Sequence, residues 1–115
     1  MAAKFEIQVA KDGEFFFHLK GDGGDILLSS EMYKAKASAQ KGIASVKTNS
    51  AVERHFERKT SVKAQPYFVL KAGNGEVIGQ SRMFHSTADL EAGIAAVRQS
   101  APAAETVDLS PRRGR

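Results

Sequence analysis

The segment Phe16-Phe-His-Leu-Lys20 returns 51 residues later as Tyr67-Phe-Val-Leu-Lys71, and this recurrence decides the fold. Outward from it, the same shift superposes residues 5–50 on residues 56–101 without a gap. Thirteen superposed pairs are identical: Phe5/Phe56, Glu6/Glu57, Phe17/Phe68, Leu19/Leu70, Lys20/Lys71, Gly24/Gly75, Ser30/Ser81, Met32/Met83, Ala37/Ala88, Gly42/Gly93, Ile43/Ile94, Ala44/Ala95 and Val46/Val97. A fixed period of this length indicates a repeated supersecondary unit. The chain therefore contains two tandem copies of one unit of roughly fifty residues.

Each copy begins with three predicted strands. Residues 5–9 alternate apolar and polar, which is typical of a half-buried strand. A second, aromatic-rich strand is predicted at residues 14–20, and a third follows near residues 25–30. Asp12-Gly13 predicts a tight turn between the first two strands. The second copy departs here, since its residues 61–65 lack glycine and predict a longer turn.

A helix closes each copy. In the second copy, Ser86-Thr-Ala-Asp89 has the form of a capping box, and Leu90, Ile94 and Val97 form an apolar stripe. Pro102 ends this helix. Beyond it, the alternation in residues 106–109 predicts a closing strand. Each copy thus reads as βββα, and the fold class is α+β.

The composition is that of one globular domain. The 115 residues are 42% hydrophobic and 26% charged, and none is cysteine, which excludes disulfides and thiolate metal sites. The N-terminus lacks the apolar core of a signal peptide, and no apolar run is long enough to cross a bilayer. We therefore expect a soluble, cytoplasmic protein without membrane contacts.

The net charge of +4 is concentrated at the C-terminus. Three of the seventeen Lys and Arg residues lie in the last four positions, namely Arg112, Arg113 and Arg115. The rest of the chain, with thirteen Asp and Glu residues, is close to neutral. A neutral body does not indicate a phosphate-binding face. Residues 110–115 are expected to form a disordered basic tail after a single pseudo-symmetric domain at residues 1–109.

The paired motifs resemble a known family. Asn74-Gly-Glu-Val-Ile-Gly-Gln-Ser81 with Met83-Phe84, and Ser29-Ser-Glu-Met-Tyr33 with residues 42–49, are similar to the repeat of the YegP-like proteins, small bacterial proteins of uncharacterised function. The resemblance covers about residues 4–101, although Gly23 replaces the usual Asn before Gly24.

This resemblance implies an architecture and no activity. Two β3-α-β motifs, at about residues 4–51 and 55–109, would form one continuous antiparallel sheet with both helices on one face. The closing strands would be exchanged between the halves, which makes the chain an intramolecular pseudo-dimer. The family has no established activity, so no catalytic residues carry over.

The two second strands supply the candidate binding surface. Because side chains alternate along a strand, Phe17, Leu19, Phe68 and Leu70 are predicted to face the core. Five other residues would then lie on the uncovered face of the sheet: Phe16, His18, Lys20, Tyr67 and Lys71. Aromatic rings beside lysines on an open sheet suit single-stranded nucleic acid. The alternatives are cross-strand pairing that stiffens the sheet and a homodimer contact through the sheet face or edge.

No residue pattern predicts catalysis, a cofactor or a metal. The three histidines, His18, His55 and His85, lack ligand partners at metal-binding spacing. Ser30 and Ser81 follow the third strands without a base placed beside them, and Met32 and Met83 are expected to fill gaps in the core. We therefore predict a non-enzymatic binding or interaction module with an unknown ligand. The alternative is a weak single-stranded nucleic-acid binder that uses the open face and the basic tail.

Overall fold

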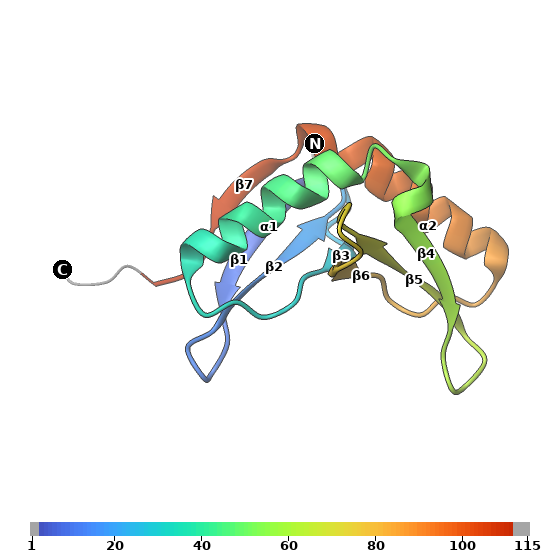
Figure 1. The fold of residues 1–115 in the computed structure, drawn as a ribbon, viewed down its shortest axis with the longest axis horizontal. Helices are drawn as coiled ribbons and strands as arrows, with labels where there is room; N and C mark the ends of the chain where they lie inside the picture. Colours follow the sequence, from blue (N-terminus) through green and yellow to red (C-terminus); the bar gives the residue numbers. More distant parts are fainter. Residues whose placement is uncertain (1–2, 112–115) are drawn as a thin grey trace.

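The computed structural model describes residues 3–111 (Figure 1). In chain order its elements are β1 (Lys4–Val9), β2 (Phe15–Lys20), β3 (Ile26–Ser29), α1 (Lys36–Asn49), the 3₁₀ turn η1 (Glu53–His55), β4 (Phe56–Thr60), β5 (Pro66–Lys71), β6 (Val77–Gln80), α2 (Thr87–Ser100), the 3₁₀ turn η2 (Ala101–Ala103) and β7 (Glu105–Asp108). The βββα order appears twice, so the predicted repeat and the α+β class are confirmed.

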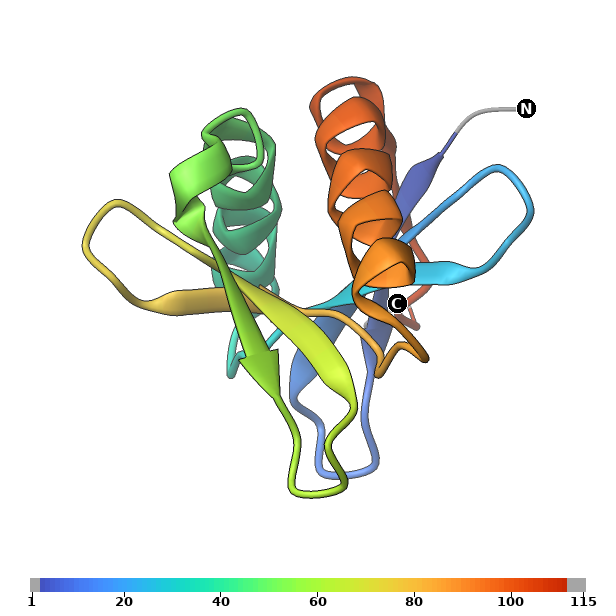
Figure 2. The same ribbon diagram turned by 90° about the vertical axis from the view of Figure 1, so that its right-hand side faces the viewer.

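All seven strands form one sheet, in the order β4-β5-β6-β3-β2-β1-β7. The two repeats meet in its middle, where β3 and β6 share the single residue pair Ser29 and Gln80. Both helices lie on the same face, while the β1–β2 and β4–β5 hairpins extend away from them (Figures 1 and 2). We call the face opposite the helices the open face.

The closing strand joins the half of the molecule to which it does not belong in sequence. Strand β7 follows the second repeat yet pairs with β1 of the first, so one of the two predicted exchanges is present; within residues 3–111 the first repeat has no closing strand to pair with β4. The sheet differs from the expected all-antiparallel arrangement in one respect, since β7 runs parallel to β1. The reason is the connection: α2 and η2 bring the chain to the start of β1, where Glu105 lies beside Lys4. The sheet is therefore mixed at this one edge.

An ion pair fastens β7 to the first helix. Lys36 Nζ lies 2.7 Å from Asp108 Oδ2, and the backbone N–H and hydroxyl of Ser110 donate to Asp108 Oδ1. These groups lower the pKa of Asp108 to about 2. Ser110, the first residue of the predicted basic tail, is part of the described structure and makes these hydrogen bonds. The tail residues Arg112, Arg113 and Arg115 lie outside the described residues.

Acid is expected to weaken the ion pair between Lys36 and Asp108. Because the pKa of Asp108 is lower in the folded chain than its ordinary value, the pair contributes stability above that value and loses it as the pH falls towards 2. The Asp108 side chain is 40% exposed, so the contribution should stay below about 1 kcal/mol. Urea unfolding of the chain and of Asp108→Asn should differ at about pH 6 and converge near pH 2. An equal difference at both pH values would contradict this assignment.

The core repeats one aromatic arrangement. Phe17 meets Phe5 edge-on with ring centroids 5.8 Å apart and stacks on Tyr33 at 6.2 Å. Phe68 meets Phe56 at 5.6 Å and stacks on Phe84 at 6.1 Å. The four residues predicted to face the core, Phe17, Leu19, Phe68 and Leu70, are all fully buried. The expectation for the methionines is wrong, because Met32 and Met83 are 45% and 36% exposed.

The two halves interlock through unlike residues at equivalent positions. The 51-residue shift superposes Leu28 on Gly79. In the structure these two residues touch, and a Cβ built on Gly79 would lie 2.6 Å from Leu28 Cδ2. Real Cβ atoms do not approach other carbons so closely, so Leu28 occupies the space that Gly79 leaves free. At the junction of the repeats, Leu28 therefore packs as a knob into the space beside Gly79.

Candidate functional site

The five predicted site residues lie on the open face, in two groups. Phe16, His18 and Lys20 alternate along β2, and Tyr67 and Lys71 lie on β5. Each of these side chains is partly exposed. Strands β3 and β6 separate β2 from β5, which puts the two groups about 14 Å apart at the usual strand spacing. The structure therefore places the five residues on one face without forming one cluster.

A row of side chains crosses the open face at the level of His18. The strand registers align it from β4 to β7 as Glu57, Val69, Gln80, Ser29, His18, Glu6 and Val107. The row passes through the junction of the repeats, so each half contributes one glutamate to it. Val69, the counterpart of His18, is only 3% exposed. We call this row, whose members are polar except for Val69 and Val107, the polar belt.

The two glutamates of this belt neutralise the candidate lysines. Lys20 Nζ lies 3.0 Å from Glu6 Oε1, and Lys71 Nζ lies 2.5 Å from Glu57 Oε1. These lysines lower the pKa of both carboxyls, chiefly through the hydrogen bonds that they donate. The identity of Glu6 and Glu57 in the two copies was the signal for these pairs in the sequence. Their partners became evident only once the strand registers were known.

His18 is partly buried among its neighbours on the open face. Glu6 and Ser29 lie beside it on the adjoining strands, and the Phe16 ring meets it edge-on at 5.3 Å. Burial, and to a lesser extent the charge of Lys20, lowers the pKa of His18. The neutral imidazole is therefore favoured, and within residues 3–111 its buried Nδ1 has no hydrogen-bond partner.

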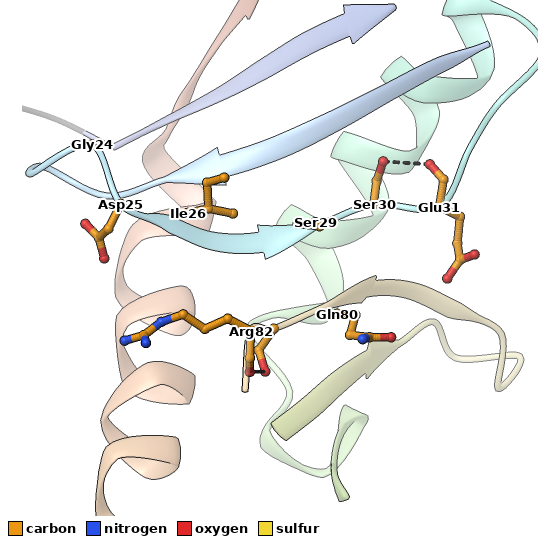
Figure 3. Close-up of a pocket in the computed structure, with 9 residues that line it drawn as sticks. Gly24, Asp25, Ile26, Ser29, Ser30, Glu31, Gln80 and Arg82 are labelled. Atoms are coloured by element: carbon orange, nitrogen blue, oxygen red, sulfur yellow. Dashed lines mark hydrogen bonds between the residues drawn. The ribbon is translucent and has the colours of Figure 1, made fainter. Parts of the chain in front are cut away.

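A groove opens where the third strands separate. Beyond the single Ser29–Gln80 pair, β3 and β6 diverge and leave a hollow of about 770 Å³. Both repeats line it, with Asp25, Ser29 and Glu31 from the first and Gln80 and Arg82 from the second. Figure 3 shows Asp25 and Arg82 towards one end of this junction groove, and Glu31 and Gln80 towards the other. Sequence reasoning missed the groove because it arises from a pairing between distant strands.

The charges in the junction groove are not symmetric. Under the repeat shift, Glu31 corresponds to Arg82. The Arg82 guanidinium lies 4.8 Å from the centroid of the Phe84 ring, a cation–π contact. Within residues 3–111, no ion pair joins Arg82 to Asp25 or Glu31. The groove thus offers both signs of charge to a ligand.

Two serine hydroxyls and one imidazole that could act as nucleophiles or a base already have hydrogen-bond partners. The Ser30 hydroxyl accepts from Phe17 N and donates to Glu31 O, and the Ser81 hydroxyl repeats this arrangement with Phe68 and Arg82. His55 Nδ1 lies 2.8 Å from Asn49 Oδ1. The described part of the chain holds no group of three His, Asp or Glu side chains suited to a metal ion. No helix within residues 3–111 has both the length and the apolar character needed to span a membrane.

Comparison with known proteins places these features in a family. The model of the "Domain of unknown function (DUF1508)" matches twice, at residues 10–57 and 61–108. UPF0339 protein PA0329 of Pseudomonas aeruginosa is 48% identical over 96% of this chain and all of its own length. UPF0339 protein YegP of Yersinia pestis is 47% identical over 92% of this chain and 95% of its own.

Solved structures agree with the fold. The solution NMR structure of the protein of unknown function YegP from E. coli superposes with a TM-score of 0.92 at 40% identity, covering 98% of this chain and 97% of that one. UPF0339 protein SO3888 from Shewanella oneidensis gives 0.88 at 37% identity, covering 96% and 93%. On these matches, which extend over both repeats, the chain belongs to the UPF0339 family of YegP-like proteins, whose repeated domain is one of unknown function.

Proposed function

We propose that this protein is a non-enzymatic binding module of the bacterial cytoplasm and that its contact site is the junction groove. One observation carries the proposal: the groove is built by both repeats and presents carboxylates and a guanidinium that are not paired with one another. Such a lining suits a small polar ligand that carries an amino group and a carboxylate, such as the backbone of a short peptide.

The placement of the charged side chains supports this ligand class. Arg82 can donate to a carboxylate at its end of the groove, and Glu31 can accept from an amino group at the other end. Ser29 and Gln80, the residue pair that joins β3 to β6, also line the groove and can bond the peptide groups. The engaged hydroxyls of Ser30 and Ser81 favour binding over hydrolysis. The absence of cysteine suits the reducing cytoplasm.

An NMR titration with triglycine tests the proposal. We expect amide shifts at residues 24–26 and 80–82, and smaller shifts with N-acetyl-triglycine amide, which lacks both terminal charges. Arg82→Gln should weaken triglycine binding about tenfold, because it removes a charge-assisted hydrogen bond. Lys63→Gln, which removes a positive charge from the exposed β4–β5 turn, should leave the affinity unchanged. Equal shifts with both peptides, or none with either, would reject the groove as the site.

The single-stranded nucleic-acid alternative stays a prediction with less support. Its two lysines, Lys20 and Lys71, are each paired with a glutamate, and its two aromatic residues lie in separate groups. A short oligothymidylate, added as a third probe, distinguishes the two functions. Shifts at Phe16 and Tyr67 that disappear steeply with salt would favour nucleic acid over the groove ligand.

A further inference from the structure

The two ends of the sheet are equivalent in the repeat but differ in the structure. The shift that relates the copies superposes β1 on β4, and both strands pair with their hairpin partners in the same register. The outer edge of β1 is covered by β7. Within residues 3–111, the sheet ends at β4, whose outer edge has no strand beside it (Figure 2, in which the green strand β4 faces the viewer).

The outer edge of β4 presents backbone hydrogen-bonding groups at Arg58. Phe68 directs its own N–H and C=O towards β6, since they bond the Ser81 hydroxyl and the Ser81 N–H. Arg58 lies opposite Phe68, so its backbone groups point away from β5 in an antiparallel ladder. The equivalent group in the first repeat, the carbonyl of Ile7, accepts from Leu109 beyond β7 at 2.8 Å. Arg58 is therefore the centre of an edge that is ready to pair.

The charged side chains of β4 are arranged about Arg58 so that the strand is complementary to a second, antiparallel copy of itself. Glu57 and Lys59 flank it, and both face the open side of the sheet. In an antiparallel pair of β4 strands centred on Arg58, Glu57 of one copy would lie opposite Lys59 of the other, twice per dimer. Charges on an edge strand ordinarily prevent pairing with other proteins. The order Glu57, Arg58, Lys59 instead favours pairing with another copy of β4, in the register centred on Arg58.

We propose that two copies of this chain associate through their β4 edges, antiparallel about a two-fold axis at Arg58, so that two sheets become one. This contact is distinct from the junction groove. A two-fold axis normal to the sheet keeps both pairs of helices on the same face and makes the interface isologous. The contact is small, so the dimer should be weak and favoured by high protein concentration and low salt.

The arginines at the axis do not oppose the pairing. Each Arg58 is held by two carboxylates, since its Nε lies 2.5 Å from Glu91 Oε2 and its Nη2 lies 2.7 Å from Glu53 Oε2. The cluster of Glu53, Arg58 and Glu91 therefore has one more negative than positive charge. Two such clusters bring two guanidinium groups together with four carboxylates. In the first repeat the same position is Ile7, which is fully buried and covered by β7.

Charge reversal at the edge tests the dimer by sedimentation equilibrium. Glu57→Lys would place lysine opposite lysine, and Lys59→Glu would place glutamate opposite glutamate. Each single variant should weaken self-association about tenfold, since the reversed contact occurs twice. The double variant should recover most of the affinity, because the opposite charges again face each other. A mixture of the two single variants should form the heterodimer in preference to either homodimer.

Two controls show whether the copies associate through the β4 edge or through another surface. Lys41→Glu on the exposed side of α1 makes the same charge change as Lys59→Glu and should leave association unchanged. The amide of Arg58 should gain protection from hydrogen exchange as the protein concentration rises. Monomers at every concentration, or a dimer that ignores the reversals, would overturn the proposal. Triglycine binding is expected to be the same in all of these variants, so failure of the dimer is distinguishable from failure of the groove.

Discussion

Replacement of Phe68 by alanine is expected to remove roughly 3–5 kcal/mol from the free energy of unfolding. The Phe68 ring is fully buried between Phe56 and Phe84, so truncation leaves a cavity that two aromatic rings cannot readily fill. Small domains have a total stability of roughly 5–15 kcal/mol, so the variant should be close to unfolding at ordinary temperature. Urea unfolding followed by circular dichroism measures the loss.

The neighbouring residue provides a matched control. Tyr67 lies on the same strand and on the open face, where it is partly exposed. Tyr67→Ala removes a ring of similar size and should cost about 1 kcal/mol or less. Phe17→Ala, the equivalent change in the first repeat, should match Phe68→Ala. A cost below about 1 kcal/mol for both phenylalanines would mean that the faces of β2 and β5 are assigned the wrong way round.

Replacement of Gly79 by leucine should be comparably severe. A side chain at this position would enter the volume held by Leu28, whose Cγ lies 2.7 Å from the position of a Cβ on Gly79. Gly79 is not among the glycines with positive φ, so the cost comes from the collision and not from the backbone. Overpacking of this kind costs about 3 kcal/mol or more where the neighbour cannot move. Thermal unfolding should show a corresponding fall in melting temperature.

A reciprocal exchange tests the mechanism of this loss. Leu28→Gly combined with Gly79→Leu moves the knob to the other repeat and should restore much of the stability that each single change removes. Gly73→Leu is the control, since a Cβ at Gly73 meets no atom within 4 Å. If the exchange were no more stable than the sum of the single changes predicts, direct contact between Leu28 and Gly79 would not explain the effect.

The sequence predicted the features that depend on local pattern. Self-comparison identified the repeat, strand alternation identified the buried faces, and the N-cap half of the predicted capping box is present, with Ser86 Oγ accepting from Asp89 N. One local prediction was wrong. The glycine-free turn at residues 61–65 has the same two backbone hydrogen bonds as the turn at residues 10–14, because Ala64 adopts a φ of 65° where the first repeat has Gly13. Alanine reaches this conformation only at some cost, so sequence alone favours another turn.

Features that depend on distant strands could not be predicted. The direction of β7 follows from where α2 ends in space, and the pairing of Glu6 with Lys20 follows from the β1–β2 register. The junction groove exists because β3 and β6 share only one residue pair. Met32 and Met83 are exposed because the residues that follow them, Tyr33 and Phe84, take the places in the core against Phe17 and Phe68. In each case the deciding contact joins residues whose proximity no periodic pattern records.

The fit of Leu28 into the space beside Gly79 makes each half dependent on the residue that the other half supplies. If either half were released and assembled with an identical partner, the same residue would stand at both positions. Two leucines would collide, and two glycines would leave a void. Covalent linkage allowed these positions to diverge, and each has since become dependent on the other. A symmetric dimer of either half would therefore lack the fit that the tandem chain has at this contact.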